Sequence, residues 1–543
     1  MADLGILHLS NDAGFRKRVD QNQHQLASSN RKTFDFIVCG AGSSGSVVAG
    51  RLAENPAVRV LLLEAGGSDD IPEISDPKKW FLNLGTNREW GFHTEPHAGL
   101  NGRTMPYTMG RALGGGSSIN VGVWSRGHKN DWDYFAEESG DVAWGYDSVL
   151  RLYHRIEDFH GLPDPLYRGE GGPIFLENSQ ASLSPFNRAA LEAMESRGMV
   201  RFDNPNGGMM EGNGGCSTTD RIIHRGSRQS VFRSYALPKM VQANLTVLTD
   251  TLVTRLLFDG KRVIGVEATR SGSLRRFIAQ EEVILSMGAV QTPKLLMQSG
   301  IGDEAELSRF RIPTVQHLPG VGRNLQDHPS VSCIWEFAEK PDQQSSLAEA
   351  VAFWKSDSSL PSPDLLMFPL MVPYMSAEST ARLRPKPESW SLACVLLSPK
   401  SRGRIRLSGA AASDPARIEA RILSDHSDVK ALAEGLKVSR EIGWSSAFGP
   451  YRGKELMPGR SNGFELEELV REAASNFSHQ ACTAKMGTDA QSVVNADLKV
   501  YGVDNLRVAD ASVLPRTMTG NTMAACVVVG ERMAEMLASK HQL

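Results

Sequence analysis

The sequence is poor in cysteine and in aromatic side chains, and it has no long hydrophobic run. Its six cysteines are scattered without a CxxC or another metal-ligand spacing, so neither a disulfide framework nor a metal site is expected. No segment approaches the roughly 18 consecutive apolar residues that a transmembrane helix requires. We therefore expect a protein without a membrane span and without a metal centre.

An excess of charge of one sign is also missing, because 59 basic residues face 62 acidic ones and the formal net charge is -3. Without a basic excess the chain is not expected to bind nucleic acid. Residues 1–33 are polar and lack the apolar core of a signal peptide, so we interpret them as an N-terminal extension. A cytoplasmic location is expected, although Asn244 and Asn476 each begin a glycosylation sequon.

The chain is long and has an ordinary globular composition. Its 543 residues, of which 41% are hydrophobic, exceed the roughly 250–300 residues that one hydrophobic core usually serves. Two domains are therefore expected. The fraction of charged residues, 22%, is also that of a typical globular protein.

Residues 34–66 predict a strand, a helix and a second strand, the βαβ unit of a Rossmann-like fold. An apolar run at 34–39 reads as a buried strand, 46–53 has helical spacing, and 58–63 is a second apolar strand. A GxGxxG pattern lies between the first strand and the helix, where its glycines permit a tight turn and the close approach of a diphosphate. These glycines are Gly40, Gly42 and Gly45.

The unit has the chemistry to hold the ADP half of a dinucleotide. Free N–H groups at the helix start face the phosphates, and Glu64 at the end of the second strand can accept hydrogen bonds from a ribose. The same half occurs in NAD and in FAD, so the unit leaves both open. The predicted contacts are Gly40, Gly42, Ser43, Ser44, Gly45, Glu64 and Ala65.

A second glycine-rich turn, GRALGGGSSIN at 110–120, follows an irregular stretch at 65–100. Three successive glycines and two serines before an apolar segment again suit a phosphate. Two such turns fit a ligand with a diphosphate and a second large ring system. The predicted contacts in this turn are Arg111, Gly114, Gly115, Ser117, Ser118 and Asn120.

The stretch GRALGGGSSINVGVWSRG at 110–127 resembles the first signature of the glucose-methanol-choline (GMC) oxidoreductases, which are FAD-dependent enzymes that act on alcohols. GAVQTPKLLMQSGIG at 288–302 resembles the second signature, and GVGRNLQDHP at 320–329 is also similar to the family. Some members attach FAD through a histidine of the first signature. Ile119 stands at that position, so the resemblance implies FAD that is bound without a covalent link.

The second signature reads as strand, turn and helix, with Thr292 as N-cap and Pro293 as the first helical residue. Before it, the segments at 245–258 and 263–270 have the alternation of an antiparallel hairpin. The resemblance implies that the helix start at Ala289 packs on the dinucleotide and that Val253 contacts the adenine.

The C-terminal part contains the expected catalytic groups. SNFSHQACTAKMG at 475–487 resembles the active-site segment HPxGTxxMG of the family, with Gln480 in place of the proline and Cys482 in place of the glycine. The resemblance implies that His479 and Asn521 are the catalytic pair. It also implies contacts with FAD at Asp510, Ala511 and Thr522.

Alcohol oxidation requires a base, because a hydride leaves carbon readily only when the hydroxyl proton is removed. Neutral His479 suits this role near neutral pH, and the Asn521 amide can hold the substrate oxygen. Flavin N5 then accepts the hydride. We expect O₂ or a quinone-like compound as the final electron acceptor and a primary or aromatic alcohol as the substrate.

The expected architecture is α/β, with a Rossmann-like FAD-binding domain on a parallel sheet and a substrate domain on a large, mostly antiparallel sheet. The FAD-binding domain combines residues 34–150, 236–329 and 475–543, and the substrate domain combines 151–235 and 330–474. Apolar side chains of 350–375 are candidates for a substrate pocket, although most are expected in the core. They are Phe353, Trp354, Met367, Phe368, Met371 and Tyr374.

Two alternatives stay open at this point. A nicotinamide-dependent dehydrogenase would use the same βαβ unit but would leave the later signatures without a role. An FAD-containing lyase that acts on cyanohydrins would share the signatures, since some family members are lyases, but would do no net redox chemistry. The sequence does not predict the oligomeric state.

Overall fold

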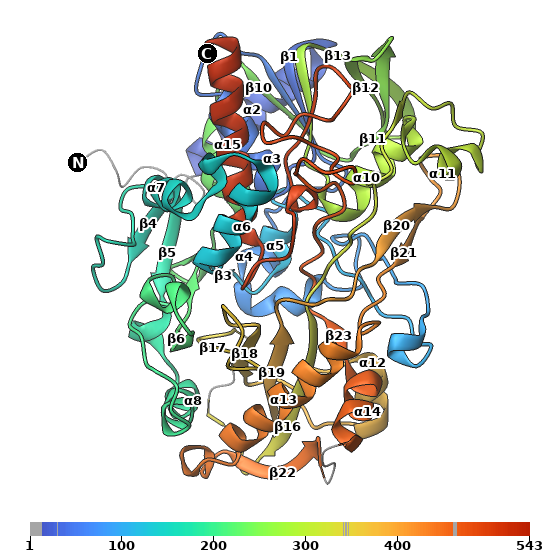
Figure 1. Cartoon of the computed structure of the whole chain (residues 1–543). Helices are drawn as coiled ribbons and strands as arrows, with labels where there is room; N and C mark the ends of the chain where they lie inside the picture. The colour runs from blue at the N-terminus through green and yellow to red at the C-terminus, as the bar shows by residue number, and fades with distance from the viewer. Residues whose placement is uncertain (1–12, 30, 340, 343–344, 346, 460–463) are drawn as a thin grey trace.

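The structure is a computed structural model that describes residues 13–29, 31–339, 341–342, 345, 347–459 and 464–543. It is built on two large sheets, one in the upper and one in the lower half of Figure 1. The upper sheet has five mutually parallel strands and an antiparallel extension formed by two more. In spatial order the strands are β10 (Leu245–Leu248), β2 (Val60–Leu63), β1 (Thr33–Cys39), β13 (Ser273–Leu285), β12 (Arg262–Arg270) and β11 (Thr251–Asp259), and β24 (Leu506–Val508) also pairs with β13.

The predicted βαβ unit is the centre of the upper sheet. β1 and β2 pair in parallel and are buried, and helix α3 (Ser43–Leu52) connects them. A Cβ on Gly45 would lie 2.0 Å from the carbonyl oxygen of Gly40. Only glycine therefore allows α3 to pack so close to the turn. The C-terminal helix α15 (Met523–His541) packs against α3 with similar closeness at Gly530, where a Cβ would lie 2.7 Å from Val47 Cβ.

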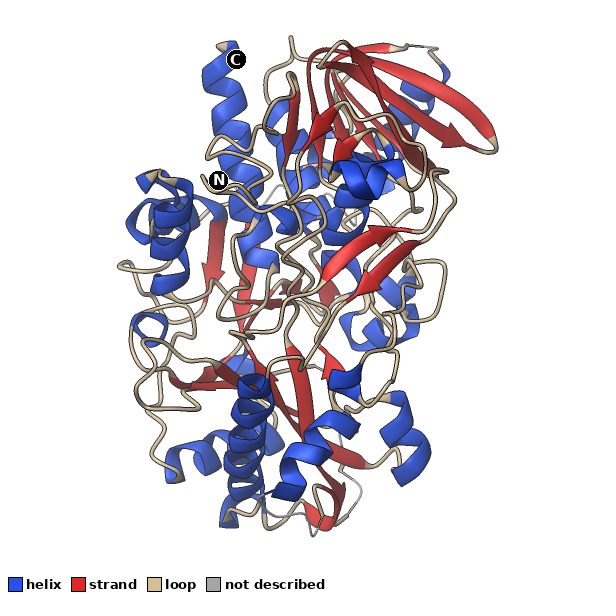
Figure 2. Ribbon diagram, turned by 45° about the vertical axis from the view of Figure 1, so that its right-hand side comes forward, coloured by secondary structure: helices blue, strands red, loops and turns tan. Residues whose placement is uncertain are grey.

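The lower sheet is antiparallel throughout its described strands. Helix α13 (His426–Gly443) covers one face, as Figure 2 shows, and a Cβ on Gly443 would lie 2.3 Å from the Trp335 ring. The strands in spatial order are β22 (Arg452–Met457), β16 (Pro329–Phe337), β19 (Ser389–Leu396), β18 (Leu365–Leu370), β17 (Ala350–Trp354) and β6 (Gly215–Thr218), and β23 (Ser475–Asn476) also pairs with β16.

Smaller elements connect and flank the two sheets. The helices are α4 (Pro72–Ser75), α5 (Gly116–Ile119), α6 (Lys129–Ser139), α7 (Tyr146–Ile156), α8 (Pro185–Ser196), α9 (Val231–Tyr235), α11 (Glu304–Ser308), α12 (Ala377–Leu383) and α14 (Phe464–Ala473). The strands are β3 (Val123–Trp124), β4 (Glu157–His160), β5 (Ile174–Asn178), β7 (Asp220–Arg221), β8 (Ile223–His224), β9 (Ser227–Arg228), β14 (Ile301–Gly302), β15 (Gln316–His317), β20 (Arg404–Leu407) and β21 (Ala416–Glu419).

Helix α2 (Ala13–Ser28) lies in the segment that the sequence predicts only as an N-terminal extension. Amide groups attach it to the edge of the upper sheet. Gln23 Nε2 donates to the carbonyl of Leu245 at 3.0 Å, and Gln23 Oε1 accepts from the Val247 N–H at 2.9 Å. The described part of the extension is therefore a structural part of the sheet edge, and residues 1–12 lie outside the described residues.

The predicted start of helix α10 (Gly288–Gln298) is wrong. The helix begins at Gly288, so Pro293 lies inside it and has no N–H for the carbonyl of Ala289. The Thr483 hydroxyl replaces that donor and binds the Ala289 carbonyl at 2.7 Å. The proline therefore creates a free acceptor, and the C-terminal segment uses it to attach to α10.

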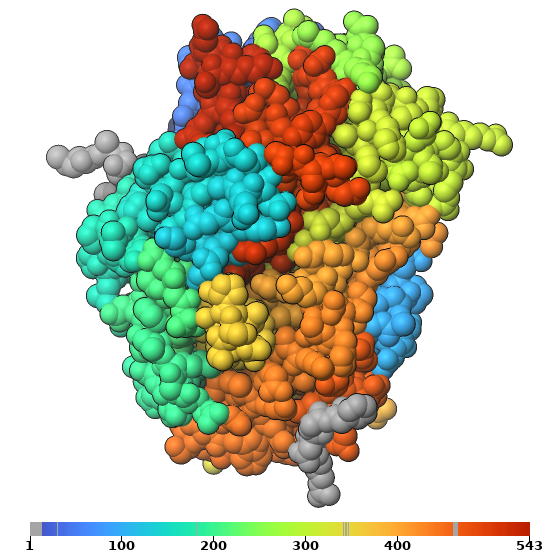
Figure 3. Space-filling view, viewed as in Figure 1, coloured from blue at the N-terminus to red at the C-terminus, as the bar shows by residue number. Residues whose placement is uncertain are grey.

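The fold class is confirmed, with a parallel and an antiparallel sheet in one chain. Figure 3 shows residues near the C-terminal end of the chain, orange-red and red, seated between teal and yellow-green segments of the earlier chain. All six cysteines are free. Among the described helices, none is both long and apolar enough to cross a membrane. The division into two discontinuous domains stays a prediction.

Candidate active site

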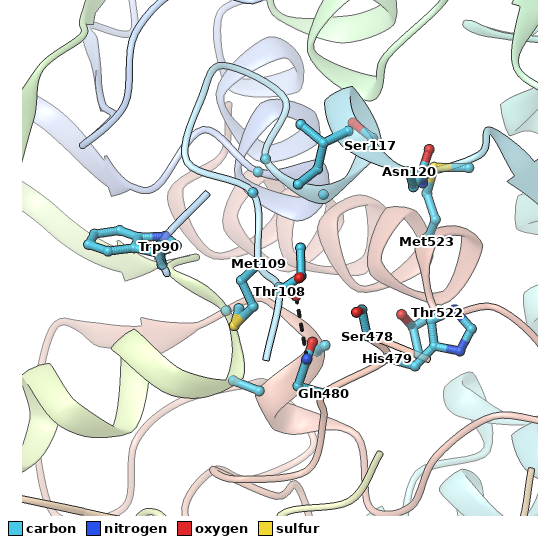
Figure 4. A pocket seen from close by; sticks show the side chains of 18 of the residues that line it. Trp90, Thr108, Met109, Ser117, Asn120, Ser478, His479, Gln480, Thr522 and Met523 are labelled. Atoms are coloured by element: carbon cyan, nitrogen blue, oxygen red, sulfur yellow. Dashed lines mark hydrogen bonds between the residues drawn. The ribbon is translucent and has the colours of Figure 1, made fainter. Parts of the chain in front are cut away.

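One cavity of about 480 Å³ joins the βαβ turn to the C-terminal segment. Its walls include side chains and backbone from within 40–44, 105–123, 286–289, 475–480 and 510–526. Figure 4 shows His479 beside Thr522, with Asn120 and Met523 on a neighbouring wall. A volume of this order is typical of sites that enclose a small molecule or a cofactor.

The starts of two long helices line this cavity. Gly42 is the N-cap of α3 and Thr522 is the N-cap of α15, and neither helix has a capping side chain or an acidic residue in its first turn. The Ser44 hydroxyl donates to the carbonyl of Cys526 at 2.7 Å and holds the two helix starts together. Uncapped N–H groups and the positive ends of two helix dipoles favour an anion such as a diphosphate.

Glu64 lies at the end of β2 and is held by backbone donors. Its carboxylate accepts from the N–H of Ala41 at 2.9 Å and of Gly66 at 2.8 Å. Burial raises its pKa to about 7, while the backbone donors and the charge of Arg111 oppose this rise. The carboxylate is thus fixed at the edge of the cavity, as a ribose acceptor must be.

The residues at the end of the cavity next to the βαβ turn fit FAD. Gly114 donates its N–H to the carbonyl of Ala41 at 2.7 Å, which holds the second glycine-rich turn against the first. A Cβ on Gly42 would meet no protein atom closer than 3.9 Å, so the space above this glycine is open to a ligand. The Ser286 hydroxyl lines the cavity, and its oxygen is buried without a hydrogen-bond partner.

Among the residues predicted to contact the cofactor or to act in catalysis, all line the cavity except Gly45, Arg111, Gly114 and Ser118. Gly45 lies under the βαβ turn, where the absence of a Cβ permits α3 to pack closely. The Ser118 hydroxyl bonds the carbonyl of Leu113 at 2.6 Å. The Arg111 guanidinium lies 5.2 Å from the centre of the Trp90 ring. These residues support the site from behind its wall.

His479 and Asn521 lie together although 42 positions separate them in the chain. Asn521 Nδ2 is 3.2 Å from His479 Nε2. His479 is partly open to the cavity, and burial lowers its pKa to about 4. The imidazole is therefore neutral near pH 7 and can accept a proton.

A second histidine, which the sequence did not point to, lies behind the first. His328 Nδ1 is 2.8 Å from His479 Nδ1. The neighbouring Asp327 accepts at Oδ1 from the backbone N–H groups of both His328 and His479, each at 2.8 Å. Burial raises the pKa of Asp327 to about 7. These two residues belong to GVGRNLQDHP at 320–329, a stretch similar to the family that gave no role for either side chain.

An aromatic cluster adjoins His479. The Phe477 ring lies 5.3 Å from the imidazole, and it stacks on Phe368 with a centroid distance of 6.0 Å. Tyr374 meets Phe477 edge to face at 5.6 Å. We call these three rings the aromatic chamber. Phe368 and Tyr374 line the cavity, whereas the other pocket candidates, Phe353, Trp354, Met367 and Met371, pack in hydrophobic clusters.

Further lining residues were not predicted. They include a tryptophan from the irregular stretch and methionines next to the glycine-rich turns and at the start of α15, namely Trp90, Met109, Met287 and Met523. The methionines adjoin motifs that the sequence does reveal, so their position in the chain could have indicated them. Trp80 and Leu84, which also come from the irregular stretch at 65–100, line the cavity as well.

Known proteins resemble this chain over most of its length. Two family models described as GMC oxidoreductase match residues 34–330 and 399–530. Human mitochondrial choline dehydrogenase is 34% identical over 95% of this chain and 91% of its own length. The crystal structure of pyridoxine 4-oxidase from Mesorbium loti has a TM-score of 0.88 with 32% identity and covers 94% of this chain and 99% of its own.

A formate oxidase structure gives a TM-score of 0.86 with 28% identity, over 95% of this chain and 100% of its own. The first model covers the two glycine-rich turns, and the second covers His479. The nicotinamide alternative is thereby set aside. The chain belongs to the GMC oxidoreductase family and is an FAD-dependent oxidoreductase that acts on CH–OH groups.

Proposed function

We propose that this chain oxidises a primary or aromatic alcohol to the carbonyl compound, with His479 as general base and Asn521 as the group that holds the substrate oxygen. The observation that carries the proposal is the 3.2 Å approach of Asn521 Nδ2 to His479 Nε2 in the cavity that also contains the βαβ turn. A hydroxyl group that lies beside both atoms would meet one donor and one acceptor at once.

The two side chains have complementary tasks. The neutral imidazole takes the hydroxyl proton at Nε2, which a pKa lowered by burial permits at neutral pH. The Asn521 amide donates to the same oxygen and stabilises the negative charge that develops there. FAD, when bound, supplies the acceptor for the hydride. An amide does not titrate near neutral pH, so Asn521 does not compete with His479 for the proton.

The cofactor contacts are proposed from the lining of the cavity. The starts of α3 and α15 hold the diphosphate, and Glu64 holds the ribose. The FAD is bound without a covalent link, because Ile119 lines the cavity at the position where some family members carry the linking histidine, and its hydrocarbon side chain has no nucleophile. Acid precipitation of the holoenzyme should leave the yellow flavin in the supernatant. A flavin that stays with the precipitate would show a covalent link.

A neutral substrate fits the walls around His479. The carboxylates that line the cavity are Glu64, Asp510 and Glu378. The first two are engaged by backbone donors at the cofactor end. Glu378 bonds Arg103 at 3.2 Å, and half of its side chain is exposed. No unpaired carboxylate among the lining residues therefore faces the aromatic chamber, which suits an uncharged, flat alcohol.

A cationic alcohol such as choline is the second candidate, because choline dehydrogenases are relatives and aromatic rings can bind a quaternary ammonium group by cation–π attraction. The two candidates differ in charge, so a comparison of benzyl alcohol with choline separates them. We expect benzyl alcohol to have the higher kcat/KM. A higher value for choline would assign the aromatic chamber to the ammonium group.

The deciding experiment for the activity is an alcohol screen that follows flavin colour without and with O₂. Anaerobic bleaching of the oxidised flavin's visible absorption band by an alcohol supports net oxidation. A substrate that turns over without bleaching would instead support the lyase alternative. Peroxide formation in air would identify O₂ as the electron acceptor, and reoxidation only by a quinone would identify a dehydrogenase.

A further inference from the structure

His328 and His479 form a pair that requires a particular arrangement of protons. Their Nδ1 atoms are 2.8 Å apart, and the ring planes are perpendicular. Burial lowers the pKa of both imidazoles, so both rings are neutral near pH 7. A neutral imidazole has one N–H and one lone pair. One Nδ1 must therefore donate and the other must accept.

The surroundings decide which ring donates. Asn521 Nδ2 is an amide donor 3.2 Å from His479 Nε2, so Nε2 accepts and the proton of His479 lies on Nδ1. His328 Nδ1 must then accept this proton, which places the proton of His328 on its Nε2. That nitrogen is buried, and no acceptor lies within hydrogen-bond geometry of it. The backbone carbonyls of Leu397 and Met518 nevertheless favour protonation of this ring.

The pair is also fixed through its backbone. Asp327 Oδ1 accepts from the N–H of His328 and from the N–H of His479, so one carboxylate oxygen holds the roots of both rings. The strand β16 starts at Pro329, directly after His328. Rotation of either ring would break the Nδ1 contact while the backbone stayed in place.

We infer that His328 sets the tautomer of His479, so that Nε2 keeps the lone pair that accepts from Asn521 in this structure and from the substrate hydroxyl during the reaction. His328 is a positioning residue, because it touches His479 and does not line the cavity. The inference rests on the proposed role of His479 as the base. A His479 ring with its proton on Nε2 would have no lone pair to offer to a hydroxyl group.

Two substitutions separate positioning from packing. In His328→Asn the side-chain oxygen can take the place of Nδ1 as acceptor, whereas His328→Leu fills the space without an acceptor. We expect His328→Leu to lower kcat by about 10²-fold with KM changed little, since the base is lost from the productive form. His328→Asn should retain a kcat at least about tenfold above that of His328→Leu. Flavin absorbance of each variant monitors cofactor content.

Nitrogen NMR of the ¹⁵N-histidine-labelled holoenzyme reads the tautomer directly. Signals that vanish in His479→Ala identify His479, and in the wild type we expect its Nδ1 to carry the proton. In His328→Leu the signals should shift to the tautomer with the proton on Nε2. A wild-type His479 with the proton on Nε2 overturns the inference, even if His328→Leu does not fold. Equal kcat in the Leu and Asn variants also overturns it.

The proposed function fails in a different way. If His479→Ala turned over at the wild-type rate, His479 would not be the base, whatever its tautomer. If His479→Ala is slow while His328→Leu matches the wild type, the base assignment stands and only the role of His328 falls.

Discussion

The two ends of the cavity are built on different principles. At the cofactor end, the proposed binding groups are backbone groups of consecutive residues, as at the α3 start at Gly42 and in the turn at Gly115. At the substrate end, side chains from three distant segments converge, because His328 lies 151 positions from His479 and Asn521 lies 42 from it. One end depends on local sequence and the other on the complete fold.

This difference separates two kinds of sensitivity. A backbone cradle tolerates changes of side chain but fails when a Cβ occupies the space of the ligand. A side-chain cluster tolerates changes of volume at its edges but fails when a donor or acceptor is removed. Substitutions at the two ends should therefore affect different measured quantities, namely cofactor affinity at one end and turnover at the other.

A large effect on FAD binding is expected in Gly42→Ala. The new Cβ would meet no protein atom closer than 3.9 Å, so the apoprotein should unfold at an unchanged temperature. It would project into the cavity that the diphosphate is proposed to fill, and such overpacking costs about 1–3 kcal/mol, up to about 10²-fold in Kd. Fluorescence titration of apoprotein with FAD gives the Kd.

The matched control for this variant is Gly208→Ala, which lies outside the cavity and where a Cβ would have an ordinary contact at 3.8 Å. It should bind FAD as the wild type does. If Gly42→Ala also bound FAD normally, the backbone cradle would be placed wrongly.

A smaller effect is expected from Asn521→Ala at the substrate end. Loss of one hydrogen bond to a developing charge costs about 1.5 kcal/mol, or about tenfold in kcat. FAD content should stay the same. Stopped-flow measurement of anaerobic flavin reduction reports this step, with Ser478→Ala as the control because its hydroxyl bonds Asn476 and neither proposed catalytic group. An unchanged reduction rate would remove Asn521 from the proton-transfer site.

Phe477→Leu should act on selectivity by a few-fold. The Phe477 ring stacks on Phe368 and lies against the His479 imidazole, and aromatic pairs contribute about 0.5–1.5 kcal/mol beyond simple burial. We expect kcat/KM to fall more for benzyl alcohol than for a straight-chain alcohol such as 1-hexanol. Equal losses for the two substrates would place the aromatic alcohol elsewhere in the cavity.

The smallest expected change is with pH. Burial lowers the pKa of His479 to about 4, so the neutral base is nearly complete above pH 5. Between about pH 5 and 6, kcat/KM for a neutral alcohol should therefore change by less than about twofold. This range also lies below the pKa of Asp327, which burial raises to about 7. A histidine with its usual pKa near 6.5 would give about an eightfold rise over the same range.

The sequence signals for the cofactor end are local. The GxGxxG spacing and the glycines and serines at 110–120 lie within short segments whose backbone geometry determines their use. His479 and Asn521 were predicted through the family resemblance and not from spacing. His328 and Asp327 were missed, because their contact with His479 depends on how β16 meets the C-terminal segment and no local pattern shows this.

Two helices show the same limit of local sequence patterns. Pro293 indicated a helix start by its usual preference, but the Thr483 hydroxyl satisfies the carbonyl that the proline leaves free, so the helix starts earlier. Helix α2 was not predicted, because it is held by amide contacts from Gln23 to the backbone of β10. Long-range side-chain contacts overrode local preference in both places.

The most direct test of the central claim is the rate of anaerobic flavin reduction by a saturating alcohol in His479→Ala. We predict that the rate falls by about 10²-fold or more, the usual contribution of a general base, while the absorbance of bound FAD matches that of the wild type. A reduction rate within about twofold of the wild type would contradict the assignment of His479 as the base.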